Sequence, residues 1–252
     1  MENITPKQLQ ILILLYRFRF LNRTQIQQFL NHKSPRRLNN WLKDLTERKI
    51  LGRNYSTKLK ENTKPAVYYL ASKSRKILLD LPDINKKVLN RAYRDKNSSQ
   101  KLIDHSIFVA SLYFLIREET KTKKSVLHFF TKTDLVTHYY LPYNRPDAYI
   151  AIEKENTTKR YFLEVIDEGT PRFMLRKKIL QYIEYFDENT WKKRTLHKNP
   201  SLLFICPNQN IKDFLNKYIA QVLEEETSDV QFFLSLKSDI LRGGSNSWEI
   251  VG

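Results

Sequence analysis

Apolar residues recur at helical spacing near the start of the chain. Between positions 5 and 19 they follow the i, i+3, i+4, i+7 series of a helix with one buried face, at Leu9, Leu12, Ile13 and Tyr16. The pattern predicts a first amphipathic helix over this stretch.

Two more short helices are predicted downstream, each with its own capping residue. Asn22 caps the second, whose inward residues are Ile26, Phe29 and Leu30. Ser34 caps the third and Pro35 takes its first position, where a missing N–H costs nothing. The apolar stripe of the third helix consists of Leu38, Trp41, Leu42 and Leu45.

The stretch that follows the third helix predicts a β-hairpin. One strand lies near residues 51 to 56, a basic polar tip covers 58 to 64, and a return strand covers 67 to 70. Three helices followed by a hairpin are typical of a winged helix-turn-helix. We therefore expect a winged helix DNA-binding domain at residues 1–80.

The rest of the chain has a different rhythm. Residues 81–103 are polar and charged and are expected to form a linker, partly helical. From residue 104 to 252 the predicted order is helix, three strands, helix, strand, helix, strand. Because the central strands are apolar on both faces, this order predicts an α/β domain with a mixed sheet.

Charge is concentrated at the N-terminal end. Of the formal net charge of +17, residues 1–79 carry 17 Lys and Arg against 4 Asp and Glu, hence +13, and the remainder carries +4. Such asymmetry favours double-stranded DNA as the partner. The expected DNA-binding residues on the third helix and the wing are Arg36, Arg37, Asn39, Asn40, Lys43, Lys58, Lys60 and Lys64. A small helical domain with a merely solvated charged face is the alternative.

Other function classes receive no support from the sequence. The apolar runs are shorter than the ~20 residues that a membrane span needs, so we expect no membrane insertion and a cytoplasmic protein. Cys206, the single cysteine, is interpreted as a buried strand residue. Five glycines leave little material for a phosphate-binding loop, and the histidines lack the spacing of a zinc site.

Two carboxylates carry the strongest chemical signal. Asp147 and Glu164 stand at the ends of two apolar strands, followed by a helix rich in Lys and Arg. Carboxylate oxygens hold hard divalent cations, which neutralise phosphate charge and activate water. A metal-dependent phosphodiesterase site is one interpretation, and ordinary strand-end acids are the other.

The second half resembles a known class of nucleases. Pro146-Asp147, Glu164 and Gln181-x-x-x-Tyr185 are similar to the pattern of the PD-(D/E)xK restriction-endonuclease-like nucleases. More narrowly, the stretch FLEVIDEGTPRFMLRKKILQYIEYF resembles the replication-relaxation family, to which the MobC-type relaxases are related. Proteins of that family also carry an N-terminal winged helix, so the resemblance covers roughly residues 5 to 240.

The resemblance implies roles for particular residues. Asp147 and Glu164 would bind Mg2+ or Mn2+. From its place at the strand end, Asp167 is either a further candidate metal ligand or a cap of the next helix. The catalytic set would be completed by residues of the following helix, namely Lys178, Gln181 and Tyr185. Ile166 departs from the nuclease pattern, which has Lys there, and Lys178 is the expected replacement because it shares a helix face with Gln181, Tyr182 and Tyr185.

We therefore expect a DNA-binding protein of a plasmid or integrative mobile element, acting as a relaxase-like, metal-dependent nickase at a transfer or replication origin. Other relaxosome or coupling proteins and a second copy of the chain are candidate partners. The main alternative is a catalytically inactive accessory factor or transcriptional repressor that uses the nuclease fold as a scaffold. A tyrosine nucleophile that attacks phosphate is another interpretation, with Tyr139, Tyr140 and Tyr143 among the candidates. Such tyrosines more often pack as half-buried strand residues.

Overall fold

The computed structural model describes residues 3–55, 64–225 and 230–251. Contacts within the chain define two compact units, residues 1–111 and 112–252. Helix α6 (Gln100–Thr122) belongs to the first unit in its first half and to the second unit in its second half.

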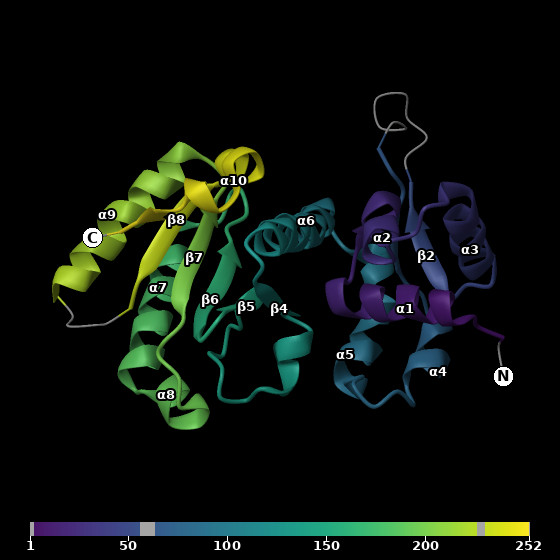
Figure 1. Cartoon of the computed structure of the whole chain (residues 1–252), viewed down its shortest axis with the longest axis horizontal. Coiled ribbons are helices and arrows are strands. Elements are labelled where there is room, and N and C mark those ends of the chain that lie inside the picture. Colours follow the sequence, from purple (N-terminus) through teal and green to yellow (C-terminus); the bar gives the residue numbers. More distant parts are fainter. Residues whose placement is uncertain (1–2, 56–63, 226–229, 252) are drawn as a thin grey trace. The chain divides into compact units, whose positions relative to one another are not determined.

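The first unit contains the expected helices and hairpin. Its elements are α1 (Pro6–Phe18), β1 (Leu21–Asn22), α2 (Arg23–Phe29), α3 (Pro35–Glu47), β2 (Leu51–Asn54) and β3 (Val67–Leu70). The strands form an antiparallel sheet in the order β1-β3-β2. Three helices with a hairpin on this small sheet constitute a winged helix-turn-helix (Figure 1).

Local capping explains where these helices begin. Asn22 accepts from the backbone N–H of Gln25, whose side chain accepts from the N–H of Asn22, and Ser34 accepts from the N–H of Arg37. Both predicted caps are confirmed. The buried stripe of α1 is rotated from the predicted one, since Ile11 and Leu15 are buried whereas Leu9 and Ile13 are half-buried.

The segment expected as a linker packs within the first unit. After α4 (Ser74–Leu78) the chain forms α5 (Lys86–Arg91) and the 3-10 helix η1 (Ala92–Asn97). The N–H of Asn85 donates to the hydroxyl of Tyr16 at 2.8 Å, and Arg19 pairs with buried Asp95 at 2.5 Å. The expectation of a linker over 81–103 therefore needs correction, because a few anchoring residues among its many charged ones dock the segment on α1.

The second unit is built on a mixed sheet in the order β4-β5-β6-β7-β8-β9. Its strands are β4 (Val126–Thr131), β5 (Ala148–Lys154), β6 (Thr157–Val165), β7 (Ser201–Cys206), β8 (Phe232–Leu236) and β9 (Glu249–Ile250). Pairs β6–β7 and β7–β8 are parallel and the others antiparallel. The predicted α/β class with a mixed sheet is confirmed.

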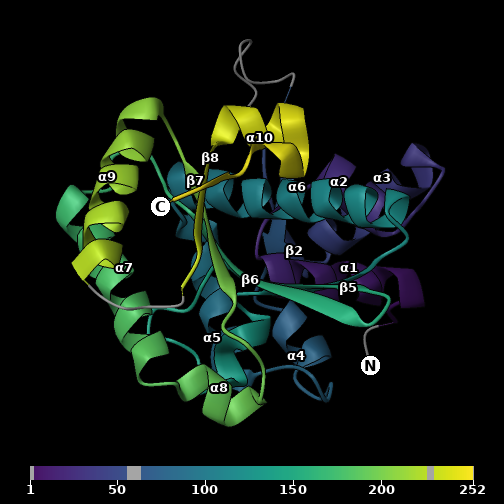
Figure 2. The ribbon, with the colours of Figure 1, turned by 60° about the vertical axis from the view of Figure 1, so that its left-hand side comes forward.

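Helices cover both faces of this sheet. The remaining elements are η2 (Asp134–Thr137), α7 (Arg172–Asp187), α8 (Thr190–Thr195), α9 (Gln209–Glu225), α10 (Lys237–Gly243) and η3 (Gly244–Ser247). Figure 2 shows α7 and α9 on one face and α10 on the other. Buried Phe162, Phe204 and Phe232 of the sheet pack with α7 and α9 in one apolar core. The order α6-β4-β5-β6-α7-β7 matches the expected restriction-endonuclease-like core.

Candidate functional site

The exposed face of α3 carries the polar residues expected to meet DNA. Leu38, Leu42 and Leu45 are buried, which turns the opposite face of the helix to solvent. The residues named from the sequence on that face are all exposed: Arg36, Arg37, Asn39, Asn40 and Lys43. Lys64 is exposed ahead of the return strand, whereas Lys58 and Lys60 lie outside the described residues.

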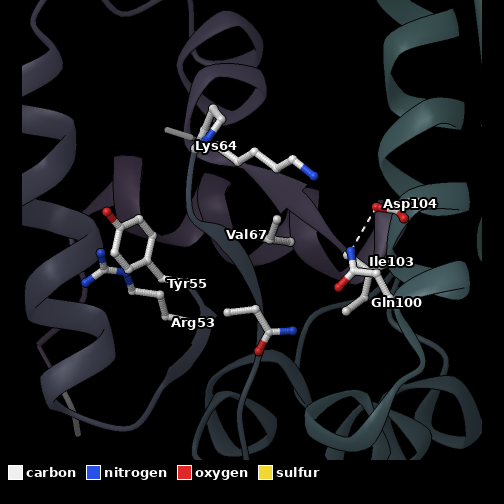
Figure 3. Close-up of a pocket in the computed structure, with 9 residues that line it drawn as sticks. Arg53, Tyr55, Lys64, Val67, Gln100, Ile103 and Asp104 are labelled. Carbon is white, nitrogen blue, oxygen red and sulfur yellow. Dashed lines mark hydrogen bonds between the residues drawn. The ribbon is translucent and has the colours of Figure 1, made fainter. Parts of the chain in front are cut away.

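A hollow of about 560 Å³ lies beside the hairpin and the start of α6 (Figure 3). Its charged lining includes Arg53, Lys64 and Asp104, and the guanidinium of Arg53 stacks on the ring of Tyr55 at 4.8 Å. Gln100 donates to Asp104 at 2.9 Å. Arg53 and Lys64 add positive charge at the hairpin.

The acidic pair is placed by the register of two antiparallel strands. Ala148 of β5 lies opposite Leu163 of β6, so Asp147 and Glu164 are neighbours at the same end of the sheet. The N–H of Asp147 donates to the carbonyl of Leu163 at 2.9 Å. Its carboxylate accepts from the N–H of Val165 at 2.9 Å, which fixes it towards β6. The structure thus brings the two acids together at neighbouring strand ends.

Glu164 is fully buried and is held by two side chains from α7. The ammonium of Lys178 donates to Oε2 at 2.5 Å, and the hydroxyl of Tyr182 donates to Oε1 at 2.6 Å. Lys178 and Tyr182 are four residues apart and so share one face of the helix. Two strands and one helix therefore bring a pair of carboxylates and a lysine into a single cluster, which we call the acid–lysine site: Asp147, Glu164, Lys178 and Tyr182.

The acid–lysine site contains two carboxylates and one ammonium, so its formal charge is negative when all three groups are ionised. Burial raises the pKa of Glu164, the nearby Asp147 carboxylate raises it further, and Lys178 opposes both. Burial alone would lower the pKa of Lys178, but the carboxylates of Glu164 and Asp147 outweigh it and raise that pKa. The two shifts have different main causes, namely burial for Glu164 and the two nearby carboxylates for Lys178. The exposed Lys132 ammonium lies 3.7 Å from Asp147 at the rim.

The chemistry of these donors fits a hard divalent cation. Carboxylate oxygens are the ligands that Mg2+ and Mn2+ prefer, and a cation would relieve the mutual repulsion of Asp147 and Glu164. In this structure the Lys178 ammonium neutralises Glu164, and it would have to release Oε2 for Glu164 to bind a cation through that oxygen. Across residues 3–55, 64–225 and 230–251, no group of three or more His, Cys, Asp or Glu side chains is placed to share a metal ion.

Asp167, the further candidate metal ligand, stays a prediction. It follows the end of β6, in a turn where its carbonyl accepts from the hydroxyl of Thr170 at 2.7 Å. Its carboxylate adds to the charge that raises the pKa of Lys178, after the larger contributions of Glu164 and Asp147.

The other two predicted catalytic residues of α7 have partners other than the two acids among the contacts of the described residues. Gln181 accepts from the side chain of Asn144 at 2.9 Å, which ties α7 to the loop before Asp147. Tyr185 is 7% exposed and belongs to the apolar core, where burial raises the pKa of its hydroxyl. The expectation that Tyr185 lies beside DNA is not supported, because its side chain points into the apolar core. Ile166, at the position where the nuclease pattern has Lys, is buried in the same core.

Two participants in the site were not selected from the sequence. Tyr182 was placed on the helix face but not as a partner of Glu164, although its i+4 spacing from Lys178 was the available signal. Lys132 follows β4 directly, and its N–H donates to the carbonyl of Asp147 at 3.0 Å. Only the pairing of β4 with β5 brings it there, and no sequence pattern reveals that register.

Within the described residues, no helix combines the length and apolar character of a membrane span. Topology and site together define a protein with a winged helix unit followed by a nuclease-like α/β unit that carries two carboxylates and a lysine. The chain belongs to the replication-relaxation family, whose model matches residues 12–199.

Comparison with curated protein sequences gave no match. Among solved structures, the chain is similar to a mutant of ZitR from Lactococcus lactis, at 18% identity and a TM-score of 0.28, covering 47% of this chain and 76% of that one. It is also similar to the restriction endonuclease FokI, at 13% identity and a TM-score of 0.37. That likeness covers 97% of this chain and 45% of FokI.

Proposed function

We propose that this protein binds duplex DNA through its winged helix and nicks a nearby phosphodiester at the acid–lysine site. The observation that supports this most is the convergence of Asp147, Glu164 and Lys178 from the ends of β5 and β6 and from α7. A buried acid kept ionised beside a lysine is costly for stability, and perturbed groups of this kind concentrate at functional sites.

Each residue has a distinct part in the proposed reaction. Asp147 and Glu164 would hold Mg2+ or Mn2+, which supplies a Lewis acid for the phosphate and a water of lowered pKa. Lys178, released from Glu164, would donate to a non-bridging phosphate oxygen and stabilise the charge that develops there. Tyr182 keeps Glu164 oriented through its 2.6 Å hydrogen bond. Lys178 would thereby replace the lysine of the nuclease pattern, which this chain lacks because Ile166 occupies that position.

DNA recognition is assigned to the first unit. α3 would enter the major groove, where Asn39 and Asn40 can read base edges and Arg36, Arg37 and Lys43 can contact phosphates. The hairpin with Lys64 would lie on the flanking backbone.

The proposed place of action is supported by the family. Membership of the replication-relaxation family supports a replication or transfer origin of a plasmid or other mobile element as the target. The protein would then act in the cytoplasm together with relaxosome or coupling proteins, and a second copy of the chain would occupy a second half-site.

A second candidate is a DNA-binding accessory factor or repressor without nuclease activity. The observation that favours it is the state of Glu164, whose two oxygens already accept hydrogen bonds from Lys178 and Tyr182. In that case the acid–lysine site would be an internal ion pair that specifies how α7 docks on the sheet.

Supercoiled plasmid carrying the origin of the protein's own element distinguishes these candidates. Wild type with Mn2+ should convert it to open circles, and EDTA should abolish the conversion. Asp147→Asn should bind the same DNA without nicking it, because the winged helix is unchanged. Binding by wild type with no nicking in Mg2+ or Mn2+ would reject the nickase and leave the accessory factor.

A further inference from the structure

Two tyrosines on the loop before Asp147 are exposed to an unusual degree. Tyr139 is 86% exposed and Tyr143 is 92% exposed. Between them, Leu141 is 7% exposed, and Tyr140 packs against Trp191 at 6.2 Å between ring centroids. A tyrosine ring gains free energy when its faces are covered, so two rings left in water on an otherwise anchored loop point to an external partner.

The loop that carries them is held in place. The guanidinium of Arg145 donates to the carbonyls of Leu135 at 2.9 Å and Val136 at 3.1 Å. On the other side, Asn144 donates to Gln181 of α7 at 2.9 Å. The rings therefore project from a fixed backbone, and covering them would cost little ordering of the main chain.

The same hydrogen bonds place the loop at the acid–lysine site. Asn144 lies three residues before Asp147, and its partner Gln181 lies three residues after Lys178 on the same helix. Tyr143 directly precedes Asn144, so it stands where the loop meets both the acidic strand end and α7. Lys132, 59% exposed beside Asp147, adds positive charge at the rim.

We propose that Tyr139 and Tyr143 form a stacking platform for unpaired bases of a single DNA strand next to the phosphate that the acid–lysine site addresses. Every base has a π-face, so stacking on tyrosine is tolerant of sequence, and the exposed Lys132 can pair with a phosphate of the same strand. Bases in a duplex are already covered by their neighbours and cannot use the rings. The platform therefore selects melted over paired DNA; it rests on the proposed function and refines its substrate.

The test is binding of the full-length protein to a fluorescently labelled oligothymidine and to an oligonucleotide of equal length with abasic sites, both in EDTA. The abasic strand keeps the phosphates and lacks the stacking faces. Wild type should prefer the base-bearing strand, and Tyr139→Ala and Tyr143→Ala should each reduce that preference by about tenfold.

Matched variants separate the rings from other effects. The double variant Tyr139→Ala/Tyr143→Ala should lose the preference, and Tyr139→Phe/Tyr143→Phe should retain it, since both rings are kept. Tyr93→Ala removes an exposed tyrosine of the first unit and should change nothing.

Two results would overturn the platform. One is equal affinity of wild type for the two strands, and the other is an unchanged preference in the double alanine variant. Loss of preference in the double phenylalanine variant would also reject it and assign the hydroxyls instead. Since all binding is measured in EDTA, failure of nicking does not affect the outcome. Conversely, if wild type nicks DNA but binds the two strands equally, only the stacking platform is rejected and the proposed nickase function stands.

Discussion

Removal of Lys178 should lower the free energy of unfolding, because it leaves the buried Glu164 carboxylate without its cation. In Lys178→Ala, Glu164 remains buried but loses the ammonium 2.5 Å from its Oε2. Breaking a buried ion pair by removing one partner costs about 3–5 kcal/mol. Because 27% of the Lys178 side chain is exposed, water reaches part of the pair, and we expect about 2 kcal/mol.

Thermal unfolding measures this directly. For a domain of this size about 1 kcal/mol lowers the melting temperature by roughly 2–4 °C, so Lys178→Ala should melt about 4–8 °C below wild type. Lys177→Ala is the matched control, since Lys177 is its exposed neighbour on α7 and should leave the transition within about 1 °C. Mn2+ should raise the melting temperature more in Lys178→Ala than in wild type, because Oε2 is no longer occupied.

A double-mutant cycle decides whether the ion pair is the cause. In a Glu164→Gln background the buried charge is absent, so the Lys178→Ala substitution should cost much less than it does alone. An equal cost in both backgrounds would refute the reasoning and assign the effect of Lys178 to packing of its methylene chain.

Three further outcomes follow from the structure. The double variant Arg36→Ala/Arg37→Ala should weaken duplex binding and reduce the slope of log affinity against log salt by about 2, measured by fluorescence anisotropy, whereas an unchanged slope would remove α3 from the DNA interface. Cys206 should not react with a thiol reagent in the native protein, because it is buried and burial raises its pKa to about 12; rapid labelling would contradict its burial. Burial and the Asp147 carboxylate raise the pKa of Glu164 above its ordinary value of 4.5, so the folded state binds a proton at Glu164 more tightly than the unfolded state does. The free energy of unfolding of wild type, relative to that of Glu164→Gln, should therefore rise as the pH falls from neutral towards 4.5, as measured by denaturant titration. A relative stability that falls over this range would reverse the assigned direction.

Local patterns predicted much of the fold. The caps at Asn22 and Ser34 and the buried stripe of α3 depend on neighbouring residues, and they lie where the sequence indicated. The strands around Asp147 and Glu164 were also predictable, because apolar runs bounded by polar residues define them. The meeting of these acids followed from the expectation that the two strands pair.

Features that depend on long-range packing were missed. The segment 81–103 is too polar to show its few buried anchors, such as Asp95, which Arg19 neutralises from the end of α1. The short helix α8 is absent from the predicted order, since its basic sequence shows only one apolar anchor, Trp191, whose indole N–H donates to the carbonyl of Lys198. Helical periodicity grouped Tyr185 with Lys178, but only the packing of α7 shows that Tyr185 faces the core.

The central claim is that Asp147 and Glu164 together hold a divalent cation for cleavage of DNA. Titration of Mn2+ into the full-length protein, followed by electron paramagnetic resonance of the free ion, tests it most directly. The account predicts saturable binding by wild type that is lost in both Asp147→Asn and Glu164→Gln and is strengthened in Lys178→Ala. Binding that is unchanged in the two carboxylate variants, or absent from wild type and Lys178→Ala alike, would contradict it.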